Sequence, residues 1–381
     1  MRWPFLYFSI LCLSKNMKLR ITALAVGCML VTITYAAPND LFLQARELKD
    51  TSSPLKVTLG ADAVNDTIDI FDIRESEGGS GDQGDYRGAH IQADYQLNPQ
   101  WGLEGRYQYR EIDYDPDTNK IHTALLGVHY TPELNLSSKD AVMFRASIWT
   151  NQSDDLNKTS ATRFYGQSFE KIKVNKPQDW QFQLDSVFSR KLDPMNQINA
   201  FASLGYSQVE VDSLNFRSRY RGCLVDVAVQ SDNQYRGNLA QPCVIDGLLV
   251  NQLEISGNAE EYGIDVDKDL NYDSIYASIG GSWNWRYRQF ESQLGYQYQR
   301  LWRQDIDNRA KDFGNTAIKD NHTLGLKLSY DITPKVKTFV QAELYQHNFV
   351  GQIPFLYNGI TASRLDRRYG LATLGVTFHG F

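Results

Sequence analysis

The stretch WGLEGRYQYREI, residues 101–112, alternates between two kinds of side chain. From Trp101 to Tyr109 every second residue is uncharged, and this set is Trp101, Leu103, Gly105, Tyr107 and Tyr109. From Glu104 to Arg110 the alternate residues are polar, and this set is Glu104, Arg106, Gln108 and Arg110. Because successive side chains of a β-strand point to opposite faces, the stretch predicts a strand that separates an apolar medium from a polar one.

The same alternation recurs along the rest of the chain. The segments are residues 55–64, 87–97, 123–131, 141–150, 179–190, 197–208, 273–285, 289–302, 322–332, 336–346 and 369–381. Together with 101–112 they predict about twelve strands, each close to the ~10 residues that cross a bilayer at a tilt. Tyr, Phe and Trp make up 12% of the chain, a composition that also favours strands.

The connections between these segments alternate in length. Short turns lie at residues 98–100, 132–140, 192–196, 286–288 and 333–335. Long polar loops lie at residues 72–85, 113–119, 151–178, 209–271, 303–318 and 348–367. This sorting is typical of an antiparallel up-and-down transmembrane β-barrel with short periplasmic turns and long extracellular loops. A β-sandwich with Greek-key links gives no reason for it.

The aromatic residues support a barrel in lipid, because such a barrel carries an aromatic girdle at each membrane interface. Near the predicted short turns lie Tyr95, Trp101, Tyr130, Phe188, Trp283, Trp285, Phe290 and Tyr330. Near the predicted long loops lie Tyr109, Trp180, Tyr298, Trp302 and Tyr369. The two groups match the two girdles.

The beginning of the chain has the pattern of a secretory signal peptide, residues 1–36. Basic residues at 18 and 20 precede an apolar run, and small residues at 36 and 37 suggest cleavage after Ala36. Residues 1–16 read as an extension before a working start at Met17, and an uncleaved membrane anchor is the alternative. Residues 37–54 then form a periplasmic leader, in which residues 38–50 could make an amphipathic helix that plugs the barrel mouth. A loose leader is the favoured interpretation.

Charge and cysteine usage narrow the possible partners. The chain carries a net charge of −6, and residues 1–36 hold only basic charges, so the exported part is more acidic still. A nucleic-acid partner is therefore not expected. Cys223 and Cys243 remain after the signal peptide, and an oxidising compartment predicts one disulfide between them.

A signal peptide, alternating strands, sorted loops and a last strand that ends in Phe381 make the chain resemble the bacterial outer-membrane β-barrel proteins over about residues 55–381. The resemblance implies an outer-membrane location and contact with outer-membrane lipid. It also implies that the last strand closes the barrel against the first. The barrel-assembly machinery then reads a C-terminal aromatic, for which Phe378 and Phe381 are the candidates.

Strand parity points a mixed set of charges into the barrel. The candidate lumen-lining residues are Asp94, Glu104, Arg106, Arg110, Arg145, Asp185, Lys327 and Glu343. Lining water, these groups need no partners, whereas a solid core of them would need near-complete pairing. Two readings therefore stay open, a narrow aqueous passage and a closed barrel filled with ion pairs.

The loop at residues 216–267 has three readings. It could be a hairpin that stands above the membrane or folds inward as a constriction, with Arg217, Arg219 and Arg221 meeting anionic solutes or surface sugars. It could be a solvated hairpin without a ligand. It could also add two wall strands and make fourteen.

The favoured function is a passive, porin-like channel for small polar solutes. The alternative is a closed barrel whose loops serve surface recognition, adhesion or polysaccharide export. No enzyme is expected, because His122 and His322 are predicted beside Thr150 and Leu344 and have no neighbouring Ser. No motif for a cofactor or a metal is found, so none is predicted.

Overall fold

The structure is a computed structural model that describes residues 41–45, 54–64, 85–113, 118–134, 136–158, 162–164, 167–312, 315–347, 350–359, 361–365 and 368–380. The predicted signal peptide, most of the predicted leader and Phe381 lie outside these ranges. Residues 34–381 belong to one compact unit, and the description below concerns that unit.

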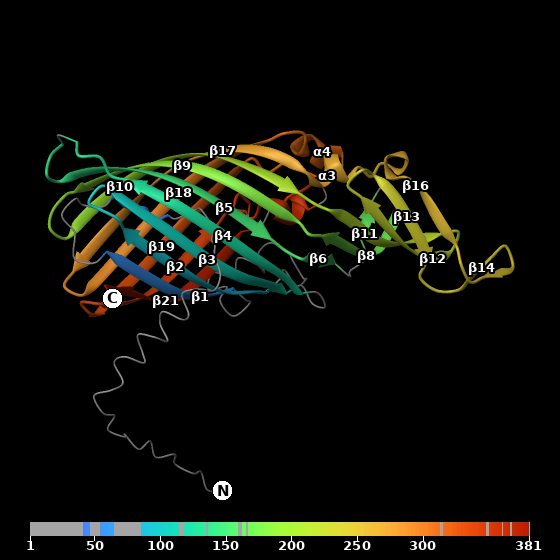
Figure 1. Cartoon of the computed structure of the whole chain (residues 1–381), viewed down its shortest axis with the longest axis horizontal. Coiled ribbons are helices and arrows are strands. Elements are labelled where there is room, and N and C mark those ends of the chain that lie inside the picture. The colour runs from blue at the N-terminus through green and yellow to red at the C-terminus, as the bar shows by residue number, and fades with distance from the viewer. Residues whose placement is uncertain are drawn as a thin grey trace, which may run out of the picture. The chain divides into compact units, whose positions relative to one another are not determined.

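Twelve strands close into a barrel in chain order (Figure 1). They are β1 (Leu55–Val64), β2 (Asp85–Gln96), β3 (Trp101–Asp113), β4 (Thr118–Tyr130), β5 (Asp140–Gln152), β9 (Gln178–Lys191), β10 (Asn196–Glu210), β17 (Tyr272–Tyr287), β18 (Phe290–Arg303), β19 (Asp320–Thr333), β20 (Val336–Tyr345) and β21 (Tyr369–His379). Each pairs antiparallel with its neighbours, and β21 pairs with β1, Phe378 opposite Val57. The predicted all-β barrel is confirmed, with twelve strands and not fourteen.

The alternation seen in the sequence becomes the two faces of the wall. Along β10 the burial of side chains alternates residue by residue, with Ser203 and Ser207 buried inside while Leu204 and Tyr206 are exposed outside. The outward side chains of the barrel are largely aliphatic and aromatic. A closed barrel leaves no unpaired strand edge, so this surface is suited to hydrocarbon. None of the helices within the described residues has the length and apolar character needed to cross a membrane.

Two strand registers differ from expectation by two residues. His122 pairs with Gln152, and Thr150 pairs instead with Ala124. Leu344 pairs with Leu324, not with His322. The second pair also contains an irregularity between Asp331 and Thr333, which shifts its register by one residue.

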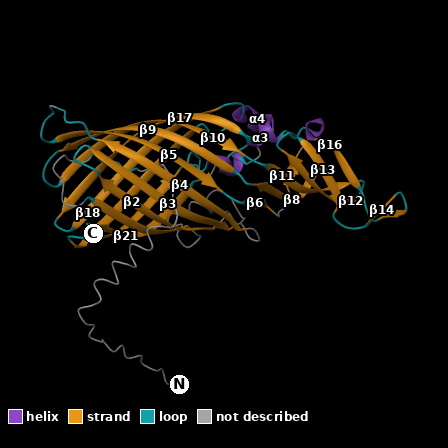
Figure 2. Ribbon diagram, viewed as in Figure 1, coloured by secondary structure: helices purple, strands orange, loops and turns teal. Residues whose placement is uncertain are grey.

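A second sheet is built from the two longest connections, and Figure 2 shows its strands beyond the long-loop end of the barrel. Its strands are β6 (Asp155–Lys158), β7 (Thr162–Phe164), β8 (Gln167–Asn175), β11 (Ser213–Tyr220), β12 (Cys223–Gln230), β13 (Gln234–Leu239) and β16 (Glu254–Asn258). We call it the outer sheet. A separate hairpin of β14 (Cys243–Ile245) and β15 (Leu248–Val250) adjoins it. The predicted Cys223–Cys243 disulfide is present, with Cα atoms 5.7 Å apart.

The outer sheet corrects two readings of residues 216–267. These residues add no wall strands, because β10 pairs directly with β17 while β11 pairs with β8 of the preceding long connection. They do not constrict the lumen either. Their apolar side chains, among them Val225, Val227 and Val229, form a small core of their own outside the barrel.

Short helices occupy the long connections. They are η3 (Ala259–Tyr262), α3 (Val266–Leu270), α4 (Ile306–Asp312), η4 (Pro354–Leu356) and α5 (Ala362–Leu365). The Asp265 carboxylate caps α3 by accepting from the Lys268 N–H at 3.1 Å. The α3 helix follows the outer sheet, and α4 lies between β18 and β19.

Candidate functional site: the lumen and its plug

The half of the lumen next to the short turns is a polar cavity of about 1570 Å³. At one end it is lined by turn residues such as Pro99 and Pro334, and at the other by Arg110 and Gln352. Between these ends the wall presents carboxylates, cations and amides. This half therefore has the lining of an aqueous vestibule.

Six of the eight lumen-lining candidates line this cavity, namely Asp94, Glu104, Arg106, Arg110, Lys327 and Glu343. The other two, Arg145 and Asp185, are buried behind the cavity surface. Arg145 joins them to the rest: its Nε donates to Glu104 at 2.5 Å and its guanidinium donates to Asp185 at 3.1 Å. Glu104, Arg145 and Asp185 thus form one part of the polar network on the inner wall.

A second part of the network surrounds Asp62. Its carboxylate contacts the His90 ring at 3.1 Å and accepts from Gln108 at 2.9 Å and from Thr373 at 2.7 Å. Parity could have assigned Asp62 and His90 to the lumen as well, since both lie within alternating strands.

Asp94, Glu104 and His129 place potential metal-ligand atoms within 4.8 Å of one another. The two carboxylates already have cationic neighbours, because Arg145 donates to Glu104 and the Lys56 ammonium lies 3.7 Å from Asp94. The His129 ring nitrogen lies 3.0 Å from Glu104. These positive charges favour an ion-pair network over a bound cation.

Residues 41–45 lie inside the barrel, with Leu41 1% and Phe42 8% exposed. Two wall glycines receive them: a Cβ at Gly325 would lie 2.6 Å from Leu41, and one at Gly295 would lie 2.8 Å from the Leu41 carbonyl oxygen. The Ala45 N–H donates to Ser189 Oγ at 2.8 Å. The interpretation of this segment as part of a loose leader is therefore wrong for these residues, because their apolar side chains fill a notch in the wall.

The half of the lumen next to the long loops is filled by the connection between β20 and β21. We call its described residues 350–359 and 361–365 the plug. Its apolar side chains are buried in one cluster with wall and loop residues. The plug members of that cluster are Val350, Ile353, Phe355, Tyr357, Ala362 and Leu365, and the wall members include Ile112, Ile121, Leu125, Trp149, Tyr272, Tyr276 and Leu301.

Hydrogen bonds hold the plug at several points. Asn151 donates to the Gln352 carbonyl at 3.0 Å, and the Tyr272 hydroxyl donates to the Pro354 carbonyl at 2.7 Å. The Tyr357 hydroxyl donates to Asp307 at 3.1 Å, and the Arg303 guanidinium stacks 3.7 Å from the centre of the Tyr357 ring. The plug is therefore fixed both to the wall and to the β18–β19 connection.

The wall behind the plug is only partly apolar. Buried polar atoms there have no hydrogen-bond partner among the described residues: Trp149 Nε1, Asp179 Oδ2, Gln181 Oε1, Ser274 Oγ, Ser278 Oγ and both amide atoms of Gln299. The plug backbone passes close to Gln299 at Gly351, whose φ of +80° and lack of a Cβ permit the approach. A polar wall thus continues beneath an apolar plug.

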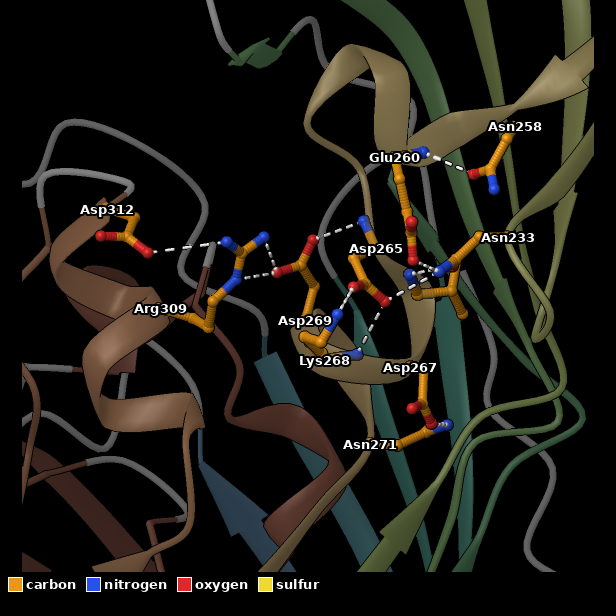
Figure 3. Close-up of polar contacts among 11 residues, drawn as sticks. Asn233, Asn258, Glu260, Asp265, Asp267, Lys268, Asp269, Asn271, Arg309 and Asp312 are labelled. Carbon is orange, nitrogen blue, oxygen red and sulfur yellow. Dashed lines mark hydrogen bonds and ion pairs between the residues drawn. The ribbon is translucent and has the colours of Figure 1, made fainter.

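A chain of polar contacts links the plug region to the outer sheet (Figure 3). Asn233, which precedes β13, donates to Asp265 at 2.9 Å, and Asp265 caps α3. At the other side of α3, Asp269 accepts from Arg309 of α4 at 2.6 Å. Figure 3 shows Arg309 pointing between Asp269 and Asp312. Because Ile306 and Ala310 of α4 pack in the plug cluster, the contacts run from sheet to plug.

The two aspartates of this link differ in electrostatic environment. Burial acts to raise the pKa of Asp265, but hydrogen bonds from Lys268 and Asn233 outweigh it and hold that pKa below its usual value. Burial raises the pKa of Asp269, and this effect exceeds the opposing influence of Arg309. Arg309 therefore offsets part of the effect of burial on the pKa of Asp269.

Sequence reasoning missed the plug. The signal was the apolar run IPFLY, residues 353–357, within a segment assigned as a long polar loop. An apolar run inside an extracellular loop must find cover, and the lumen is the nearest place to bury it.

No protein-family model matches this sequence, and no curated protein matches it either. Solved structures with similar folds include the translocator domain of the autotransporter NalP from Neisseria meningitidis, with 7% identity, a TM-score of 0.44, and 95% of this chain and 94% of that chain covered. The KdgM porin is 8% identical with a TM-score of 0.35, covering 86% of this chain and 99% of that chain. The β domain of the Bordetella autotransporter BrkA is 9% identical with a TM-score of 0.42, covering 86% and 98%.

The closed twelve-stranded barrel with its apolar outer wall is that of a transmembrane β-barrel of the outer-membrane type. What it does in that membrane depends on the lumen and its plug.

Proposed function

We propose that this barrel is a gated channel for small polar solutes, and that the plug closes it in the conformation described. One observation carries the proposal: an apolar plug covers a wall that keeps unpaired polar atoms. A channel wall has to be polar along its whole length, while a permanently solid barrel gains nothing from polar atoms left without partners.

The energetics favour a plug that can leave. Each buried polar atom without a partner costs about 1–3 kcal/mol relative to its hydrated state. Withdrawal of the plug would let water reach Gln181, Ser274, Ser278 and Gln299, which offsets part of the apolar burial lost from Phe355 and its neighbours. The closed and open states then differ by less free energy than the buried apolar surface alone suggests.

The vestibule chemistry suits small polar solutes of either sign. Asp94, Glu104 and Glu343 line the same cavity as Arg106 and Lys327. Mixed charges hold water and dipolar solutes without trapping one kind of ion. Transport through such a lumen requires no catalytic group, and we propose none.

Single-channel recording in a planar bilayer tests the proposal with three forms of the folded chain. In the first, the plug is native. In the second, residues 350–365 are replaced by a short Gly-Ser linker. In the third, Asn151→Cys and Gln352→Cys allow the plug to be cross-linked to the wall.

We expect rare openings for the native plug, steady conductance for the linker variant, and silence for the oxidised cross-link that reduction relieves. The unmodified chain under the same reduction is the control for the natural disulfide. A linker variant that is folded but silent would rule out a gated channel.

The outer sheet supports a second function, recognition at the cell surface. Arg219, Arg221 and Arg236 are exposed on it, and the β14–β15 tip leaves Leu248 72% and Leu249 67% exposed. An exposed apolar tip beside cations is typical of a contact surface. If the linker variant stays silent, this closed-barrel function becomes the better proposal.

A further inference from the structure

A tyrosine–histidine site lies on the lipid-facing wall at β3 and β4. His122 is paired with Tyr109, and its Nδ1 shares a hydrogen bond with the Tyr107 hydroxyl at 2.9 Å. The imidazole ring lies 6.2 Å from the Tyr107 ring and 5.1 Å from the Tyr109 ring, centroid to centroid. The Tyr109 hydroxyl donates to Glu111 at 2.6 Å, and Arg87 donates to the same carboxylate.

The same construction recurs at β18 and β19. His322 is paired with Tyr298, and its Nδ1 shares a hydrogen bond with the Tyr296 hydroxyl at 2.7 Å. The ring centroids are 6.1 Å apart for Tyr296 and 5.0 Å for Tyr298. The Tyr298 hydroxyl donates to Asp320, and Arg300 donates to the same carboxylate.

The two sites lie on opposite sides of the barrel. In the closed order of twelve strands, β18 and β19 each stand six places after β3 and β4. The sequence repeats with them, since Tyr-Gln-Tyr occurs at 107–109 and 296–298, and His-Thr at 122–123 and 322–323. Two separated strand pairs therefore carry the same tyrosines and histidine in the same register. The ion pair beside them is placed differently, from Glu111 of β3 and Arg87 of β2 at one site and from Asp320 of β19 and Arg300 of β18 at the other.

Both sites lie where the outer wall changes from aliphatic to charged. From the short-turn end of β19 toward the long loops, the outward residues are first Leu328, Leu326 and Leu324, then His322, and then Asp320. In the same direction along β4, the outward residues Val128 and Leu126 come before His122, and Lys120 comes after it. This level is the interface between acyl chains and headgroups on the extracellular side.

An aromatic girdle alone does not explain this construction. At the opposite rim, Phe290 and Tyr330 form an edge-on aromatic pair with ring centroids 5.0 Å apart, and the Tyr330 hydroxyl donates to Gln289. That pair contains neither a histidine nor an ion pair. The two tyrosine–histidine sites add an imidazole and a guanidinium, which are donors that suit an anion.

Within the described part of the chain, the Nε2 atoms of both histidines have no hydrogen-bond partner, and both side chains are exposed. Arg87 also has an exposed side chain, and Lys120 pairs with Glu111 on the strand beside it. A phosphate at this level could accept from an imidazole Nε2–H and from a neighbouring guanidinium or ammonium group.

We propose that each site binds a phosphate-monoester headgroup of an outer-leaflet glycolipid, so that one barrel carries two such lipids on opposite walls. The inference concerns the outer wall and is independent of whether the lumen opens.

Native mass spectrometry of the folded chain, released from detergent micelles, tests this by counting bound lipids. The probe is diphosphoryl lipid A, and the matched control lipid is the same molecule without its phosphates. We expect the unmodified chain to saturate at two phosphorylated lipids and to bind the dephosphorylated lipid at least roughly tenfold more weakly.

Variants then assign the two lipids to the two sites. Tyr107→Phe keeps the ring but releases the imidazole, and His322→Ala removes the second donor. Each is expected to lower the stoichiometry from two to one, and the double variant to zero. Tyr330→Phe at the opposite rim is the control and should keep two.

Heat-modifiable migration on gels confirms that each variant is folded before lipids are counted. The proposal is overturned if the double variant still binds two lipids, if binding to the unmodified chain does not saturate at two, or if the dephosphorylated lipid binds equally well.

Discussion

The two halves of the lumen are built by the same twelve strands but are filled in opposite ways. Near the short turns the inner wall surrounds a polar cavity lined by residues such as Glu104 and Lys327. Near the long loops the same strands surround the apolar plug around Phe355 and Tyr357. The wall does not decide the filling, since polar residues such as Gln181 and Gln299 continue into the plugged half.

The lumen is therefore blocked by residues of a loop connection and not by the barrel strands themselves. The strands form a wall with polar residues along its length, and the connection between β20 and β21, packed against α4, occupies one half of it. A closed state made in this way can be changed by residues that contribute nothing to barrel stability.

The largest effect is expected from Phe355→Ala. The Phe355 side chain is 3% exposed and packs in the plug cluster. Truncation of a buried Phe costs about 3–5 kcal/mol, and because this cost falls on the closed state alone, it raises the ratio of open to closed channels by roughly a hundredfold or more. Single-channel open probability measures it.

Phe188→Ala is the matched control, because Phe188 faces lipid at 38% exposure and does not belong to the cluster formed by the described plug residues. If the two variants have the same open probability, the packing of the plug does not control whether the channel is closed. The difference between the two halves of the lumen would then have no effect on gating.

A smaller effect is expected from Phe42→Asp, which acts in the cavity half. Phe42 lies against Gly295 and Gly325 and also lines the cavity, so a carboxylate in its place loses the apolar contact and is better solvated in the cavity. The segment at 41–45 should leave the notch and widen the vestibule. The plug and the segment at 41–45 obstruct the same path in series, and the plug is the larger obstruction. Single-channel current should therefore rise only when Phe42→Asp is made in the variant that lacks the plug.

The half-exposed Gln44 provides the control substitution, Gln44→Asp, which adds the same charge without removing an apolar contact. An increase of current from Phe42→Asp with the native plug in place would contradict the arrangement in series.

The sequence predicted the wall because period 2 is a local property. Each of Glu104, Arg106 and Arg110 could be placed inside the barrel from its own strand alone. The number of strands could be predicted because the alternating segments, rich in Tyr and Gly, differ clearly in composition from the polar loops between them. Closure of β21 on β1 followed from the chemistry of strand edges in lipid.

The filling of the lumen could not be predicted in this way. Phe355 is buried in one cluster with Ile112, Trp149 and Leu301, which come from three different strands. The same holds for Leu41, which lies against Gly295 of β18 and Gly325 of β19, where a side chain would leave no room for it. Such contacts join distant parts of the chain, so neither hydropathy nor spacing within a loop reveals them.

The link between outer sheet and plug gives the next prediction, Arg309→Met. The Asp269 side chain is 5% exposed, and removal of its guanidinium partner leaves a buried carboxylate without a cation. The α3–α4 contact should loosen, and the open probability should rise by roughly tenfold, a change worth about 1.4 kcal/mol. Lys311→Met removes an exposed charge from the same helix and is the control.

The pH dependence of Arg309→Met has a defined sign. Burial already raises the pKa of Asp269, and loss of Arg309 raises that pKa further. A buried carboxyl with a raised pKa destabilises its site when ionised, so acidification through that pKa neutralises it and restores stability. Lower pH should therefore return the variant toward the closed state, and an open probability that rises with acid would contradict the role of Asp269.

The smallest effect on conductance is expected from reduction of Cys223–Cys243. The bond joins β12 to the β14–β15 hairpin, and neither element belongs to the barrel or to the plug cluster. Reduction releases a loop constraint worth about 3 kcal/mol, but the loss falls on the hairpin at the edge of the outer sheet. Hydrogen exchange should increase in residues 243–250 while single-channel open probability stays within error of the oxidised chain. A change in gating would show that the hairpin bears on the plug through the α3–α4 contacts, and would move control of closure from the lumen to the outer sheet.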